Sequence, residues 1–171
     1  MIDIDIPRSR DDVGAASRTA ARGSRFSRVR VISYMFAFAA GPAVAGQPSS
    51  PAAARAVVQR YYAAIDRRDF RRAYVQWGDG GRASGKTFDS FARGFASTTH
   101  THAITGSPGR VEGAAGSLYV DVPVDVYAKL KDGHHQHFSG SYVVRRVNNV
   151  PGARAAELRW HIESAKLHLV R

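Results

Sequence analysis

The residues that most directly suggest a chemistry form a glycine-rich stretch in the middle of the chain. Residues 80–87, Gly-Gly-Arg-Ala-Ser-Gly-Lys-Thr, fit the phosphate-loop pattern G-x-x-x-x-G-K-[ST]. In nucleoside triphosphatases this loop joins a buried parallel strand to a helix, so that backbone amides and the lysine converge on the phosphates. Here the preceding residues repeat with helical spacing, and no alternating strand and helix units follow. The sequence therefore favours a glycine-rich loop between two helices, with nucleotide binding at 80–87 as a remote alternative.

Histidines are the second group that could do chemistry, because residues two apart on a strand point to the same side. His100 and His102 form one such pair, and His135 and His137 form another. A firm zinc site needs three or four converging ligands, more than one such pair supplies. We therefore expect no metal ion and no cofactor.

Residues for covalent catalysis are missing. The chain has no cysteine, which excludes disulfides, thiol catalysis and cysteine-bound zinc. No serine lies in a G-x-S-x-G nucleophile elbow. The sequence therefore assigns no catalytic residue, and it favours a noncatalytic role over an enzymatic one.

Aromatic residues gather in three short segments with helical periodicity, beginning near Ala54. The first segment is apolar on one face. Asp69 is expected to cap a second helix that runs through Trp77 and stops at Gly78, and Thr87 is expected to cap a third. The apolar residues of the three segments are Val57, Val58, Tyr61, Ala64 and Ile65, then Phe70, Ala73, Tyr74 and Trp77, then Phe88, Phe91 and Phe95.

From about Thr98 the periodicity changes from helical to two. Over residues 118–130 the even positions are Leu, Val or Ala, whereas most odd positions are polar or aromatic. Residues 131–134 predict a hairpin turn, residues 135–147 the returning strand and residues 159–170 the last strand, with Trp160 and Ile162 inward. Three helices followed by strands joined through tight turns indicate an α+β fold, with the helices packed on a curved, mostly antiparallel sheet of about four to six strands.

The N-terminal segment has the pattern of an export signal. Arginines at 25, 28 and 30 precede a short apolar run at 31–40, and Ala43-Val44-Ala45 supplies a small-x-small cleavage site. The run is shorter than the roughly 20 residues that span a bilayer, so no membrane anchor is expected after cleavage. We expect residues 1–45 to be an N-terminal extension and signal peptide, 46–53 a linker and 54–171 the domain, which would be periplasmic or secreted.

The predicted domain is basic. Removing residues 1–45 takes seven Arg and four Asp from the 25 basic and 14 acidic residues, so the formal charge falls from +11 to +8. A positive field attracts nucleic acids, anionic lipids and acidic small molecules alike. Outside the cytoplasm, nucleic acid is the partner that we exclude.

The first predicted helix carries a family resemblance. Residues 56–65, Ala-Val-Val-Gln-Arg-Tyr-Tyr-Ala-Ala-Ile, followed by Asp69-Phe70, resemble the first helix of the nuclear transport factor two-like and ketosteroid isomerase-like (SnoaL-like) superfamily. The later elements follow that family's order over residues 54–168, and the motifs at 77–81, 88–95 and 160–162 are similar to those of exported bacterial members. The resemblance implies a cystatin-like cone, which hosts enzymes, binders and assembly modules alike. It also implies a possible homodimer, because members often associate through the open sheet.

Ketosteroid isomerases allow the enzyme hypothesis to be compared residue by residue. There a tyrosine on the first helix donates a hydrogen bond to the developing oxyanion, and Tyr61 stands at that position. The reaction also needs a carboxylate base and a protonated acid beside the tyrosine. The corresponding ranges, 81–86 and 134–153, contain no Asp or Glu. An enzyme of isomerase or polyketide cyclase type is therefore our second hypothesis, and it would need an atypical site.

Our first hypothesis is an exported, noncatalytic domain that binds a small molecule or a protein partner through an aromatic-lined pocket. Two tyrosines would supply hydroxyl groups and the other aromatic residues apolar walls, with packing in the core as the alternative for each. The pocket residues that we predict are Tyr61, Tyr74, Trp77, Phe91, Tyr142 and Trp160.

Overall fold

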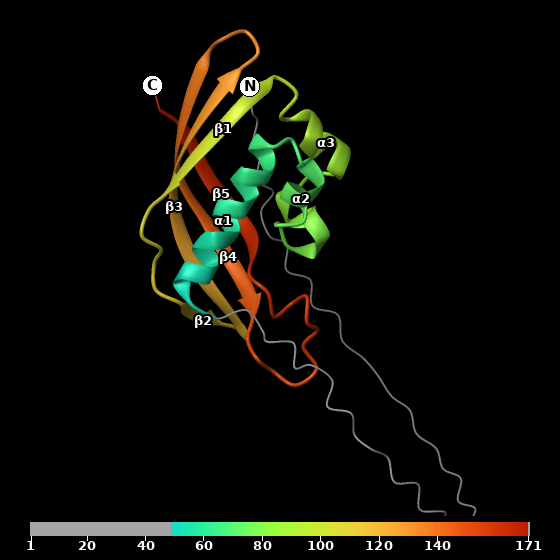
Figure 1. The fold of residues 1–171 in the computed structure, drawn as a ribbon. Helices are drawn as coiled ribbons and strands as arrows, with labels where there is room; N and C mark the ends of the chain where they lie inside the picture. Colours follow the sequence, from blue (N-terminus) through green and yellow to red (C-terminus); the bar gives the residue numbers. More distant parts are fainter. Residues whose placement is uncertain (1–48, 171) are drawn as a thin grey trace, which may run out of the picture. The chain divides into compact units, whose positions relative to one another are not determined.

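The computed structural model describes residues 49–170 (Figure 1). The predicted signal peptide lies outside these residues. Within them, helices come first and strands follow. The elements are α1 (Pro51–Asp66), α2 (Phe70–Tyr74), the 3-10 helix η1 (Asp79–Ser84), α3 (Phe88–Arg93), β1 (Thr98–Thr105), β2 (Glu112–Ala114), β3 (Ser117–Leu130), β4 (His135–Val147) and β5 (His161–Leu169).

The strands form one antiparallel sheet in the order β1-β3-β4-β5, and β2 pairs with β3. The sheet is curved, and α1 crosses one of its faces (Figure 1). There α1 contacts β1, β3, β4 and β5, whereas α2 contacts α1 and α3. The predicted α+β class and the antiparallel sheet are therefore confirmed. No helix among residues 49–170 is long and apolar enough to span a membrane.

Alternation in β3 positions the core as predicted. Val120, Val122, Val124 and Val126 are at most 4% exposed, because every second side chain points toward α1. The opposite face carries polar and aromatic residues. The core residues outside β3 are Ala54, Val57, Val58, Tyr61, Tyr62, Ala64, Ile65, Ala73, Tyr74, Trp77, Phe91, Tyr142, Val144, Trp160, Ile162 and Ala165.

Both predicted helix caps are present. The Asp69 side chain accepts a hydrogen bond from the Arg72 amide at 3.0 Å, and the Thr87 hydroxyl accepts one from the Ser90 amide at 3.3 Å. Each cap satisfies an amide that has no partner within its helix. α1 begins at Pro51, three residues earlier than predicted, with Ser50 as its cap.

The predicted end of the second helix at Gly78 is wrong, because α2 ends at Tyr74. The following residues pair with the start of β5 instead. The Gly78 amide donates to the Ile162 carbonyl at 2.9 Å, and the Ile162 amide donates to the Gln76 carbonyl at 2.7 Å. Trp77 thus forms a parallel bridge with Ile162. The helical spacing of the sequence around Trp77 could not show that the backbone groups of Gln76 and Gly78 would form hydrogen bonds with β5 instead of continuing the helix.

Candidate functional site

Tyr61 is at the centre of a buried aromatic cluster under α1. Its ring centroid lies 4.9 Å from that of Tyr62, 6.0 Å from Tyr142, 6.1 Å from Trp77 and 6.3 Å from Phe91. These rings come from α1, β4, the segment after α2, and α3. Edge-on and tilted pairs at such distances add to the stability that apolar burial supplies. Four of the six predicted pocket residues therefore meet in one packed cluster.

A cavity of about 50 Å³ adjoins this cluster between α1, β1 and the sheet. Of the predicted pocket residues, Tyr61 and Tyr142 line it. The other lining residues are Tyr62, Phe95, Thr98, Thr101, Val126, Ala128, Phe138 and Leu167. We call this space the tyrosine cavity. Its volume corresponds to about two water molecules at roughly 30 Å³ each.

The predicted pocket residues other than Tyr61 and Tyr142 do not line the tyrosine cavity. Tyr74 packs against Phe91 with 5.3 Å between ring centroids and donates its hydroxyl hydrogen to the Lys86 carbonyl at 2.7 Å. Trp77 and Trp160 are buried and line a second, larger cleft that shares no lining residue with the tyrosine cavity. The six aromatic residues are therefore divided between a cavity, a packed core and a cleft.

The polar groups that line the tyrosine cavity are side-chain hydroxyls of tyrosine and threonine. The hydroxyls of Tyr62 and Tyr142 are 2.6 Å apart and share one hydrogen bond. The buried hydroxyls of Thr98 and Thr101 have no hydrogen-bond partner within residues 49–170. A buried polar group left unpaired costs roughly 1–3 kcal/mol, which makes these two oxygens sites where a polar occupant would be stabilised.

Sequence reasoning did not find Tyr62, Thr98 or Thr101. Tyr62 follows a residue already placed on the buried face, and α1 is covered by the sheet widely enough to bury both tyrosines. The signal for Thr101 was the alternation in β1, where Thr101 and Ala103 share the inward side. The polar composition of Thr98–His102 concealed that alternation.

Burial keeps the three tyrosines of the site protonated. Loss of hydration raises the pKa of Tyr61 well above its ordinary value, and the nearby Tyr142 raises it further. The Trp77 indole opposes this shift in pKa, although its nitrogen does not reach hydrogen-bond geometry with any described residue. Burial likewise raises the pKa of Tyr62 and of Tyr142 well above the usual range. All three phenols are therefore neutral donors and acceptors at physiological pH.

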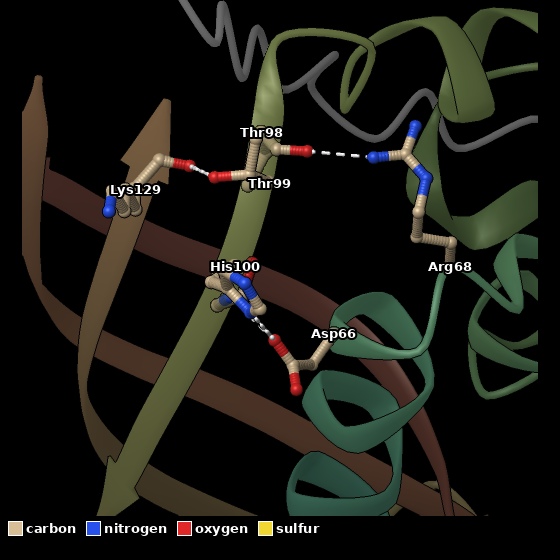
Figure 2. A network of polar contacts seen from close by, with 7 residues as sticks. Asp66, Arg68, Thr98, Thr99, His100 and Lys129 are labelled. Carbon is tan, nitrogen blue, oxygen red and sulfur yellow. Dashed lines mark hydrogen bonds and ion pairs between the residues drawn. The ribbon is translucent and has the colours of Figure 1, made fainter. Parts of the chain in front are cut away.

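A carboxylate at the end of α1 fixes β1 beside the cavity. One Asp66 oxygen accepts a hydrogen bond from the Thr101 amide at 2.9 Å. The same oxygen lies 3.5 Å from the His100 ring nitrogen (Figure 2). Asp66 thus satisfies the backbone amide of Thr101, whereas the hydroxyl of Thr101 has no hydrogen-bond partner in the described chain. This positions Thr101 toward the sheet interior without placing the carboxylate in the cavity lining.

The same strand is held at two further points. The Arg68 guanidinium donates to the Thr98 carbonyl at 3.0 Å, and the Thr99 hydroxyl donates to the Lys129 carbonyl at 2.9 Å (Figure 2). Thr98 and Thr101 are therefore anchored through their backbones from α1 and from the α1–α2 turn, while their hydroxyls stay unpaired.

The tyrosine cavity has no acid or base among its lining residues. No Asp, Glu, His, Lys or Arg of the described chain lines it. Proton transfer of the isomerase type needs a carboxylate within hydrogen-bond reach of the substrate. Tyr61 retains the means to donate a hydrogen bond, but this cavity supplies no group to take a proton.

The glycine-rich loop is not arranged as a phosphate loop. Gly80, Gly81 and Gly85 adopt positive φ in a 3-10 turn between α2 and α3, and a packed Tyr74 ring covers Gly81. A phosphate loop needs free amides ahead of a helix. Here the amides of Gly81, Ala83 and Gly85 donate to carbonyls at Trp77, Gly78 and Arg82, and the Lys86 amide donates to the Ser84 hydroxyl.

Four of the described histidines each lie within ion-pair distance of a single carboxylate. His137 lies 3.0 Å from Asp125, and His134 lies 3.0 Å from Asp132. No group of three or more His, Asp or Glu side chains suited to a metal ion occurs in the part of the chain that the structure describes.

Comparison with known proteins yields structural similarities alone. No family model and no curated protein matches the chain. A solved structure from Kribbella flavida is similar, with 16% identity over 70% of this chain and 90% of that chain and a TM-score of 0.48. A second, an NTF2-like family protein from Streptomyces avermitilis named as a candidate dehydratase, has 16% identity over 71% and 99% and a TM-score of 0.45. NTF2-like proteins are therefore among the structures that this chain resembles, and the suggested dehydratase activity is that of the Streptomyces protein.

Proposed function

We propose that this domain is a noncatalytic binding module that holds a small neutral molecule in the tyrosine cavity. The observation that carries the proposal is the pair of buried, unpartnered hydroxyls on Thr98 and Thr101. Such groups are commonly satisfied by an ordered water or a ligand. The apolar lining, in which Phe95, Phe138 and Leu167 take part, favours a ligand that also has an apolar side.

The size of the cavity sets the ligand class. About 50 Å³ suits a molecule of a few heavy atoms, well below the roughly 300 Å³ of ordinary cofactor sites. A larger ligand would require Phe138 and Leu167 to move, and both are partly exposed. The favoured ligand is uncharged, because neutral phenols and threonine hydroxyls cannot compensate a buried charge.

Titration with 2-propanol, followed through backbone amide chemical shifts, tests this function. We expect shifts centred on Tyr61, Thr98 and Thr101. Thr101→Val keeps the shape and removes the hydroxyl, so it should weaken binding several-fold, on the order of 1 kcal/mol. Thr105→Val is the matched control, because Thr105 is on the same strand and outside the cavity, and its hydroxyl accepts only an exposed hydrogen bond from Gln59. Equal shifts in native protein and Thr101→Val, or none near these residues, would contradict the proposal.

Export and association are part of the same proposal. The signal pattern at 25–45 supports a periplasmic or secreted location, and a mass corresponding to Gly46–Arg171 after fractionation would test it. The homodimer implied by the family resemblance stays a prediction, which light scattering on the processed protein can decide.

A further inference from the structure

The second cleft differs in chemistry from the tyrosine cavity. It has a volume of about 910 Å³, and Trp77 and Trp160 contribute to its wall. Five arginines line it, from α1, from η1, from β4 and from the segment between β4 and β5. They are Arg60, Arg82, Arg145, Arg154 and Arg159. Asp79 and Glu157 are the acids of the same lining, so the cleft is strongly basic.

Two of the five arginines are already paired. Arg145 lies 3.7 Å from Glu163 and donates to the Ser117 hydroxyl at 3.2 Å. Arg154 donates to Glu157 at 2.8 Å, and that carboxylate also accepts from the Arg154 amide at 2.8 Å. This pairing keeps the pKa of Glu157 below its ordinary value, so Glu157 is ionised and its charge is matched by Arg154.

The other three arginines have no ionic partner in the described chain. Neither Arg60, Arg82 nor Arg159 forms a hydrogen bond or ion pair through its guanidinium with residues 49–170. These three arginines come from separate parts of the chain. The fold, and not a basic run in the sequence, therefore brings their side chains to one cleft. Asp79 is the one unmatched acid in the described lining.

Charge balance indicates the occupant. Three unmatched guanidinium groups and one unmatched carboxylate leave an excess of two positive charges, which corresponds to a dianion. A phosphate monoester carries between about 1.5 and 2 negative charges at neutral pH, and its oxygens accept the paired N–H groups of guanidinium. The cleft is also larger than a phosphate ion. We propose that this cleft binds a small molecule that carries a phosphate monoester, with Arg60, Arg82 and Arg159 as its ligands.

This site does not depend on the tyrosine cavity, and either proposal can fail alone. The experiment is calorimetric titration of the full chain with glycerol 3-phosphate at fixed ionic strength, with glycerol as the uncharged comparison. The native protein should bind glycerol 3-phosphate and not glycerol. Arg60→Gln/Arg159→Gln should weaken binding at least about tenfold, since it removes two of the guanidinium groups that would donate charged hydrogen bonds to the phosphate.

Matched variants keep the test specific. Arg67→Gln removes an exposed arginine at the end of α1 that does not line the cleft, and it should change affinity by less than about twofold. Arg82→Gln is the second test variant, to be used if the double variant does not fold, and it should weaken binding several-fold. Lys86→Ala should leave binding unchanged, because Lys86 lies outside the cleft lining.

Vesicles distinguish the two sources of a phosphate. Phosphatidylglycerol vesicles that bind while glycerol 3-phosphate does not would overturn the small-molecule site in favour of a lipid surface. Loss of binding in Lys86→Ala would move the phosphate to residues 80–87 and also overturn it. So would equal weakening by Arg67→Gln, which would indicate an unspecific response to charge, or no binding by the native protein.

Discussion

The hydroxyl of Tyr62 on α1 lies 2.6 Å from the hydroxyl of Tyr142 on β4, so one buried hydrogen bond joins residues 80 positions apart. Both side chains are at most 6% exposed. The bond therefore connects the first helix to the centre of the sheet at the edge of the tyrosine cavity. Removing one hydroxyl would leave the other without its partner in an environment that hydrates it poorly.

Substituting these tyrosines tests that connection. Tyr62→Phe or Tyr142→Phe should each lower the free energy of unfolding by about 1–3 kcal/mol, because the remaining hydroxyl loses its bond. The double variant should lose less than the sum, since no orphan hydroxyl remains. Urea unfolding measures all three. Tyr127→Phe is the control, because Tyr127 is 43% exposed, and it should change stability by less than about 0.5 kcal/mol. Strictly additive losses would contradict the coupling.

Alkaline pH should unfold the domain through the same residues. The folded-state pKa values of Tyr61, Tyr62 and Tyr142 are raised, whereas an unfolded tyrosine titrates near about pH 10. Their contribution to stability is therefore complete below about pH 10 and is lost as the pH rises from there toward the folded-state pKa values. Urea midpoints should fall steeply above about pH 10, and Tyr61→Phe should make the slope smaller. Ionisation of all tyrosines near pH 10 while the protein stays folded, seen in ultraviolet absorbance, would exclude this.

The end of α1 makes a separate prediction. Asp66 accepts a hydrogen bond from the Thr101 amide, and Thr101 is 9% exposed. Asp66→Ala should lower stability by about 1–3 kcal/mol, because it leaves that amide unpaired. Asp66→Asn keeps an oxygen acceptor and should lose less. Hydrogen exchange at the Thr101 amide provides the direct measurement, with fast exchange expected in Asp66→Ala. Native-like protection of the Thr101 amide in Asp66→Ala would show that Asp66 does not hold β1.

The fold was predictable where its signal is local. Alternation fixed the buried side of β3, and the capping residues Asp69 and Thr87 marked the starts of two helices. The end of α2 was not predictable, because Trp77 and Gly78 leave the helix to pair with Ile162, and no nearby residue records that pairing. Helix length here depends on a distant strand.

The candidate sites were predictable only in part, for the same physical reason. Tyr61 and Tyr142 were recognised as hydroxyl-bearing aromatics, and both line the cavity. Thr101 was missed because the polar composition of Thr98–His102 concealed the alternation that buries its side chain under α1. The second cleft, which five arginines line, could not be predicted from the sequence, since Arg60 and Arg159 come together through folding alone.

The glycines of the 80–87 loop provide the last prediction, because two neighbours with positive φ differ in their surroundings. A Cβ at Gly81 would overlap the Tyr74 ring, whereas a Cβ at Gly80 would meet nothing within 4 Å. Both Gly→Ala variants carry the backbone cost of a positive φ, about 1–2 kcal/mol. Gly81→Ala must also displace a packed tyrosine whose hydroxyl bonds the Lys86 carbonyl, so its loss should exceed that of Gly80→Ala by a further 1–3 kcal/mol or so. Urea unfolding of the two variants measures the difference. Equal losses would mean that Gly81 is required by backbone conformation alone, and that Tyr74 does not fix the loop.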